Sequence, residues 1–188
     1  MGAVSDSLRG RLLVATPDLA DPNFFRTVVL VLEHSDDGAL GVILNRPSPA
    51  TAVEDPLPAW ASLAVDPPVI FVGGPVQPEA AIGLAHRAER AAPDGFAPLS
   101  DELGTVDLER HPAQVAPRVD RVRVFAGYAG WGPRQLEQEL DADGWFVVDA
   151  DPADLWTAEP DTLWRTVLRR QRGKERIFAE FPLDASLN

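Results

Sequence analysis

The chain has 188 residues, of which 45% are apolar, and its 29 acidic and 17 basic side chains give a formal net charge of −12. The absence of cysteine excludes disulfides, thiolate metal sites and a cysteine nucleophile, and it favours a cytoplasmic location. The acidic balance disfavours direct binding to nucleic acid or to an anionic membrane.

Length and apolar runs predict one globular domain over residues 1–188, neither exported nor inserted in a membrane. A chain of this size buries one sizeable core but is short for two ordinary domains. Residues 1–7 lack the basic region and the apolar core of a secretory signal. No apolar run approaches the ~20 residues that span a bilayer.

Apolar, β-branched runs predict the first strands. Residues 11–15 form a short strand, and a turn over 18–25 follows whose phenylalanines fill the core. Residues 27–32 are apolar without alternation, which is typical of a strand buried on both faces. Asp37-Gly38 marks the turn of a hairpin whose second strand covers 39–44.

This hairpin predicts a cluster of polar side chains at its open end. Antiparallel pairing brings Asn45 and Arg46 close to Arg26, and Asn23 lies in the preceding turn. A pair of guanidinium groups beside amides can receive a carboxylate or a phosphate. The alternative is that the two asparagines hold turns while the arginines bind carbonyl groups or pair with nearby acids.

Proline and glycine divide the middle of the chain into short elements. Residues 47–68 should hold short helical turns, around Val53 and Trp60, rather than a long element. Residues 69–72 predict a buried strand that ends at Gly73-Gly74, where glycine permits backbone angles closed to other residues. The segments that follow are a partner strand over 81–86 and an exposed loop over 87–98.

The glycines at 127, 130 and 132 follow a predicted strand over 122–127 and precede a predicted short helix over 133–140. Together with Asp149 they imitate a dinucleotide-binding unit. However, their order is reversed, Trp131 occupies the place where backbone must approach a pyrophosphate, and Pro133 removes one N–H group. We therefore favour a tight structural corner that seats Trp131 over a nucleotide site.

The C-terminal third predicts a strand over 145–148 and a last helix over about 160–171 with an apolar stripe. Basic residues along and after that helix follow a purely acidic stretch, an order that the helix dipole favours. The alternative is a local site for DNA, although nothing here is typical of a helix-turn-helix. The stripe consists of Leu163, Trp164, Val167 and Leu168, and the basic row of Arg165, Arg169, Arg170, Arg172, Lys174 and Arg176.

Catalytic and metal motifs are not found. His34, His86 and His111 are isolated, and the run from Glu33 to Asp37 is explained by its hairpin turn better than by a metal. No serine lies in a G-x-S-x-G motif, and no Lys-Ser or Lys-Thr follows a glycine loop as in a P-loop. We assign no catalytic residue, no metal and no cofactor.

Four blocks of the chain together resemble the AlgH/YqgE family of small bacterial proteins, which are often uncharacterised or labelled as transcriptional regulators. The resemblance implies an α+β fold in which a bifurcated, partly barrel-like mixed β-sheet is surrounded by helices, and it implies no established reaction. The matching blocks are residues 13–28, residues 33–47 without the turn, residues 73–76, and residues 125–140 with Trp145 after them.

These observations lead to a first hypothesis and two alternatives. The first is a non-enzymatic regulatory or accessory protein that binds a partner protein or a small anionic ligand. An enzyme acting on small phosphorylated or nucleotide substrates is the second, and a DNA-binding regulator using the C-terminal arginines is the third. The expected binding residues are Asn23, Arg26, Asn45, Arg46, Gly73, Gly74, Gly130 and Trp131.

Overall fold

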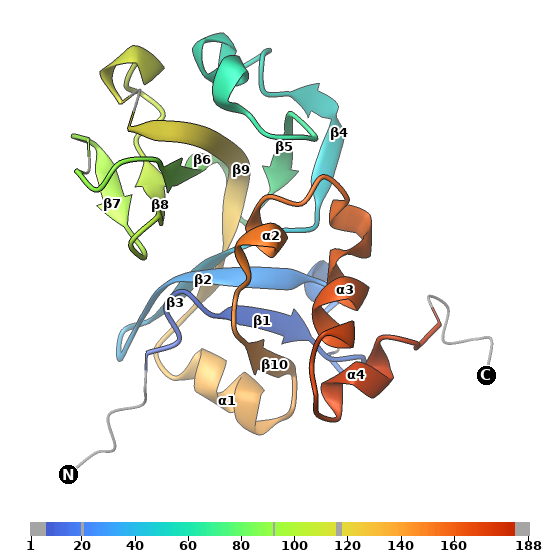
Figure 1. Cartoon of the computed structure of the whole chain (residues 1–188). Helices are drawn as coiled ribbons and strands as arrows, with labels where there is room; N and C mark the ends of the chain where they lie inside the picture. Colours follow the sequence, from blue (N-terminus) through green and yellow to red (C-terminus); the bar gives the residue numbers. More distant parts are fainter. Residues whose placement is uncertain (1–6, 20, 92, 116–117, 183–188) are drawn as a thin grey trace.

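A computed structural model describes residues 7–19, 21–91, 93–115 and 118–182 of the chain. Its mostly antiparallel sheet curls into a half-barrel, with short helices against it (Figure 1). The strands are β1 (Leu12–Ala15), β2 (Val28–Ser35), β3 (Gly38–Ile43), β4 (Pro47–Ala52), β5 (Val69–Val72), β6 (Val76–Arg87), β7 (Phe96–Pro98), β8 (Leu103–Val106), β9 (Val119–Trp131) and β10 (Trp145–Val148).

The sheet forks at β9. Its main path runs β10-β1-β2-β3-β9-β6-β8-β7, and the β4–β5 pair branches from β9 through a parallel β5–β9 contact. Every other pairing between the described strands is antiparallel. The bifurcation implied by the family resemblance is therefore visible in the pairing itself.

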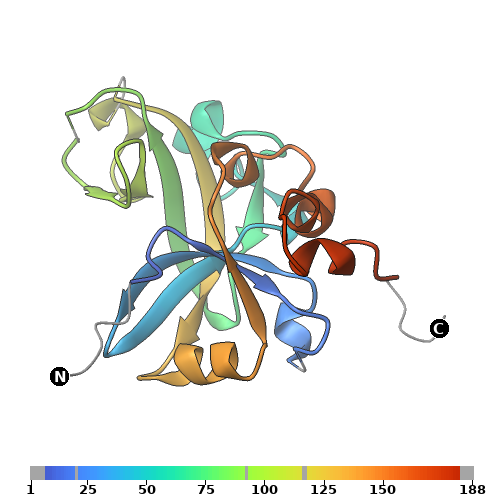
Figure 2. The same cartoon turned by 60° about the horizontal axis from the view of Figure 1, so that its bottom comes forward.

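Strand β9 corrects the prediction of a glycine corner before a helix. The strand does not end at Gly127 but continues to Trp131, and helix α1 (Gln135–Asp141) starts only after Arg134. Gly127 has a left-handed φ of 70°, and beyond it β9 leaves β5 and pairs with β3. The glycine permits a bend inside a long strand, which Figure 2 shows running the height of the molecule.

The middle of the chain holds more strand than its composition predicts. Residues 47–52 form β4, which tolerates prolines because it lies at an edge of the sheet. The predicted strand over 81–86 exists within β6, but it pairs with β8 and β9 and not with β5. Strands β7 and β8 were not expected, whereas the helical turn around Trp60 is confirmed by a 3₁₀ helix over Pro58–Leu63.

The helices cover the sheet only in part, so the expected enclosure by helices is met only partly. Helix α1 lies beside β10, and the remaining helices gather along one flank (Figure 1). No helix in the described residues is long and apolar enough to cross a membrane. The helices of that flank are α2 (Pro152–Leu155), α3 (Leu163–Arg169) and α4 (Glu175–Phe178), with a 3₁₀ turn over Pro160–Thr162.

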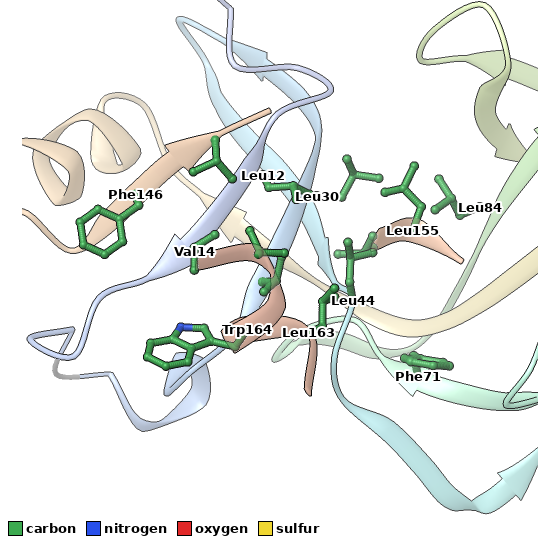
Figure 3. Close-up of a cluster of buried hydrophobic side chains, with 14 of the residues drawn as sticks. Leu12, Val14, Leu30, Leu44, Phe71, Leu84, Phe146, Leu155, Leu163 and Trp164 are labelled. Carbon is green, nitrogen blue, oxygen red and sulfur yellow. The ribbon is translucent and has the colours of Figure 1, made fainter. Parts of the chain in front are cut away.

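The prediction that residues 27–32 are buried on both faces is confirmed by the core. Val28, Leu30 and Leu32 belong to one apolar cluster, while Val29 and Val31 belong to another on the opposite face. The predicted stripe of α3 completes the first cluster, as Figure 3 shows for Leu163 and Trp164. Helix α3 is thereby fixed against β1 and β2, next to the open end of the β2–β3 hairpin.

Candidate anion-binding site

Asn45 organises the open end of the β2–β3 hairpin. Its side chain is buried, its Oδ1 accepts the Val28 N–H at 2.9 Å, and its Nδ2 donates to the Arg26 carbonyl at 2.8 Å. The amide thus continues the backbone pairing beyond the end of the strands. The prediction that the hairpin brings Asn45 and Arg46 to Arg26 is confirmed, and Asn45 holds the backbone of the site together.

Arg26 lies against an aromatic ring, and in the described part of the chain it pairs with no carboxylate. Its guanidinium carbon is 4.6 Å from the centre of the Trp164 ring, and Nη2 donates to the Phe181 carbonyl at 2.8 Å and to the Pro182 carbonyl. Burial lowers the pKa of Arg26, and repulsion from Arg165 lowers it further. Two cations therefore face each other here.

Arg46 brings a third cation to the same place. It donates to the Phe25 carbonyl, and burial lowers its pKa although Asp161 opposes that change. We call the cleft between these side chains the arginine cleft; its volume is about 220 Å³. The arginine cleft is lined by Phe25, Arg26, Asn45, Arg46, Asp161, Thr162, Trp164 and Arg165.

The arginine cleft is a positive site in an acidic protein. Three arginines meet one aspartate there, while the chain as a whole carries a net charge of −12. Within the described residues, Arg26, Arg46 and Arg165 form no ion pair with a carboxylate. Asp161 offsets part of this charge, and the remaining excess of partly desolvated guanidinium groups favours an anion there.

A second cleft adjoins the first and shares Arg46 with it. Its volume is also about 220 Å³, and its walls are mostly apolar. Asn23 lies at its rim, in a turn where its backbone N–H binds Asp21 Oδ1 at 2.9 Å. We call it the proline cleft; it is lined by Asn23, Ile43, Arg46, Pro47, Val72, Gly74 and Pro75.

Three of the expected binding residues line neither cleft. Gly73 is part of the backbone pairing, since its N–H donates to the Ala126 carbonyl at 2.8 Å. Gly130 pairs with Leu40, toward the turn of the hairpin. Trp131 is buried and its indole donates to Glu139 Oε2 at 2.9 Å.

Sequence reasoning missed the contribution of α3 to the site. Arg165 stood in the C-terminal basic row and Trp164 in an apolar stripe, and neither pattern says which strand end the helix will contact. The spacing of residues in this helix did indicate where Arg165 lies. Arg165 follows the buried residues Leu163 and Trp164 directly, so its side chain lies at the margin of the helix face that packs on the sheet.

Other members of the basic row form ion pairs within the chain. Arg170 donates to Asp154 Oδ1 at 2.7 Å and to Oδ2 at 2.6 Å, and Arg169 pairs with Glu180 at 3.0 Å. These ion pairs fit the structural interpretation of the row. Arg165 is the member that lines the arginine cleft.

We expect Arg170→Ala to lower the free energy of unfolding by about 2 kcal/mol, because it leaves the buried Asp154 carboxylate with only its α2 capping bond. Arg172→Ala is the matched control, because it removes the same charge from an exposed position. It should change the free energy of unfolding by less than about 0.5 kcal/mol. Urea denaturation measures both. Equal stability of the two variants would contradict a structural role for the Arg170–Asp154 pair.

The histidines also serve local structure. His34 accepts the Leu8 N–H at 3.0 Å on Nδ1 and meets Glu137 at 3.0 Å through Nε2, while His86 lies 2.6 Å from Asp120. In the run from Glu33 to Asp37 the first three residues end β2 and Asp36 and Asp37 form the turn, so the run belongs to the hairpin as predicted. The described residues contain no cluster of three acidic or histidine side chains that could hold a metal.

Comparison with known proteins decides the family. The family model described as AlgH-like matches residues 12–176. The chain belongs to the AlgH-like family. A UPF0301 protein of Streptomyces coelicolor is 52% identical over 186 residues, which cover 97% of this chain and 96% of that protein.

Two solved structures share this fold. A crystal structure of a Corynebacterium diphtheriae protein superposes with a TM-score of 0.86 at 32% identity, covering 96% of this chain and 95% of the other. The solution structure of AlgH from Pseudomonas aeruginosa gives a TM-score of 0.71 at 28% identity, covering 98% and 100%. The half-barrel is thus the fold of solved proteins similar to this AlgH-like chain.

The lining of the arginine cleft suits binding. Its three guanidinium groups offer N–H donors and positive charge, and Trp164 offers an apolar wall. The Thr162 hydroxyl donates to the Glu159 carbonyl at 3.1 Å, so it serves its own turn. The cleft of this AlgH-like protein thus places cationic donors beside an apolar wall.

Proposed function

We propose that this AlgH-like protein is a cytoplasmic regulatory or accessory protein that binds an anionic group, a carboxylate or a phosphate, in the arginine cleft. The observation that carries the proposal is the meeting of Arg26, Arg46 and Arg165 without a paired carboxylate in the described residues. The site has a polar scaffold in Asn45 and an aromatic wall in Trp164.

Electrostatics support binding at this place over the rest of the surface. A chain with a net charge of −12 repels anions in general, so a local group of cations is where an anion gains most. Binding would also relieve the repulsion between Arg26 and Arg165 that lowers the pKa of Arg26. Binding at this cleft should therefore weaken strongly as salt concentration rises.

The test is calorimetric titration of the full chain with inorganic phosphate, pyrophosphate and succinate at low ionic strength. We expect binding by the wild type and a tenfold or greater loss in Arg165→Ala, because a charge-assisted hydrogen bond contributes about 1.5–3 kcal/mol. Arg165 is a better choice than Arg26, whose guanidinium also holds the C-terminal segment.

Arg172→Ala is the control, since it removes the same charge from an exposed position outside the cleft. It should bind the three probes as the wild type does. The proposal fails if no probe binds, or if Arg172→Ala and Arg165→Ala weaken binding equally.

A further inference from the structure

We infer that the occupant of the arginine cleft is an acidic side chain of a partner protein, whose neighbouring apolar side chain enters the proline cleft. This inference rests on the proposed function and deepens it. It is carried by the juxtaposition of the two clefts, the exposure of apolar side chains around them, and the contrast between their charge and that of the whole chain.

The size of the clefts favours single side chains as occupants. Each cleft measures about 220 Å³. Sites for cofactors and drug-sized ligands are commonly about 300–1,000 Å³. A nucleotide would therefore overfill either cleft, whereas one side chain of a peptide segment suits each.

The shared residue determines how a segment would lie. Arg46 lines both clefts. When an acidic residue of a peptide segment pairs with the Arg46 guanidinium, the neighbouring side chains of that segment therefore reach the proline cleft. The walls change character across Arg46, from cationic beside Arg165 to apolar beside Pro47 and Val72. An acidic residue adjacent to an apolar residue matches this change.

Exposed apolar side chains surround the same place. Among the described residues, four large apolar side chains are exposed: Phe25 (46%), Val72 (48%), Ile177 (69%) and Phe181 (37%). Phe25 lines the arginine cleft, Val72 lines the proline cleft, and the Phe181 carbonyl accepts from Arg26. Aromatic residues and arginine are the types enriched at protein interfaces, and a free phosphate would leave this apolar surface unused.

Charge argues for a protein rather than a nucleic acid. A duplex presents a continuous row of phosphates and needs an extended basic surface. Of the C-terminal basic row, Arg169 and Arg170 are engaged in ion pairs with acids. One short cationic site in a chain of net charge −12 selects a single acidic side chain instead.

Selection from a random heptapeptide library displayed on phage, with the full chain as bait, tests this inference. We expect recovered peptides to be enriched in an aspartate or glutamate next to an apolar residue. A synthetic peptide of the recovered consensus should bind at least tenfold more weakly when its acid is replaced by the corresponding amide. The unchanged peptide should bind the Arg165→Ala variant more weakly than the wild type by a similar factor.

Val72→Thr separates the two clefts, because threonine keeps the β-branched shape of the strand residue and adds a polar group to the wall. It should weaken the consensus peptide about threefold or more and leave phosphate binding unchanged. Arg172→Ala should change neither.

Several outcomes would overturn the inference. If phosphate binds in the arginine cleft but no acidic and apolar pair is enriched, the inference is wrong while the proposed function stands. If neither phosphate nor any peptide binds, both are wrong. Preferential binding of duplex DNA would identify a different occupant. So would tighter peptide binding by Asp184→Asn alone, because it would show that Asp184 of the chain's own C-terminus competes with the peptide.

Discussion

Replacing Gly74 with alanine should unfold the protein or lower its free energy of unfolding by about 3 kcal/mol or more. A Cβ atom at this buried position would overlap the carbonyl group of Tyr128 and the amide nitrogen of Ala129. These are backbone atoms of β9, at the point where the sheet forks, so they cannot move without breaking strand pairing. Urea denaturation followed by circular dichroism measures the loss.

Gly130→Ala is the matched control, since both glycines were expected to belong to a binding site. At Gly130 the nearest atom to an added Cβ is a ring carbon of Tyr128 at 3.4 Å, an ordinary contact. Alanine also restricts the unfolded chain more than glycine does, so we expect a change within about 1 kcal/mol. Equal effects at the two positions would show that the close approach of Gly74 to β9 is not what constrains it.

This contrast shows what the sequence could reveal about its glycines. Gly74 and Gly130 were expected in a binding site and Gly127 in a tight corner, but the structure gives the three glycines different roles. Gly74 allows the connection between β5 and β6 to approach β9 closely, Gly127 allows a bend with a positive φ, and Gly130 is an exposed residue of a strand. A glycine pattern alone does not distinguish close approach, bending and ligand contact, because these depend on strands distant in the sequence.

The hairpin was predictable because its determinants are local. The apolar run of β2, the turn at Asp36-Asp37 beside Gly38, and the polar residues after β3 lie within about twenty residues, and antiparallel pairing fixes their geometry. Strands β7 and β8 were not predictable, since each is only three or four residues long and lies among turns. Such strands exist because neighbours in the sheet pair with them.

The candidate site illustrates the same division between local and distant determinants. Arg26, Asn45 and Arg46 were placed together from the hairpin, whereas Trp164 and Arg165 approach from a helix more than a hundred residues further along the chain. Their arrival depends on the packing of Leu163 and Val167 against β1 and β2. The cleft that we propose as an anion site is complete only when both segments are in place.

Two tryptophans of the second apolar cluster, on the opposite face of the sheet, lead to the second large effect, expected for Glu139→Ala. The Oε2 atom of Glu139 accepts the indole N–H of Trp131 at 2.9 Å and that of Trp145 at 2.8 Å. The two indoles lie on β9 and β10 and are 5% and 4% exposed, so neither can readily bind water instead. Two unsatisfied buried donors should cost about 3 kcal/mol of unfolding free energy.

Glu139→Gln separates the hydrogen bonds from the charge. The amide keeps one oxygen that can accept from both indoles, and its loss of charge should cost only about 1 kcal/mol. Urea denaturation with tryptophan fluorescence measures both variants, and neither should alter phosphate binding, because Glu139 does not line the arginine cleft. If the alanine variant is as stable as the glutamine variant, the indoles find other partners and α1 does not tie β9 to β10 through this carboxylate.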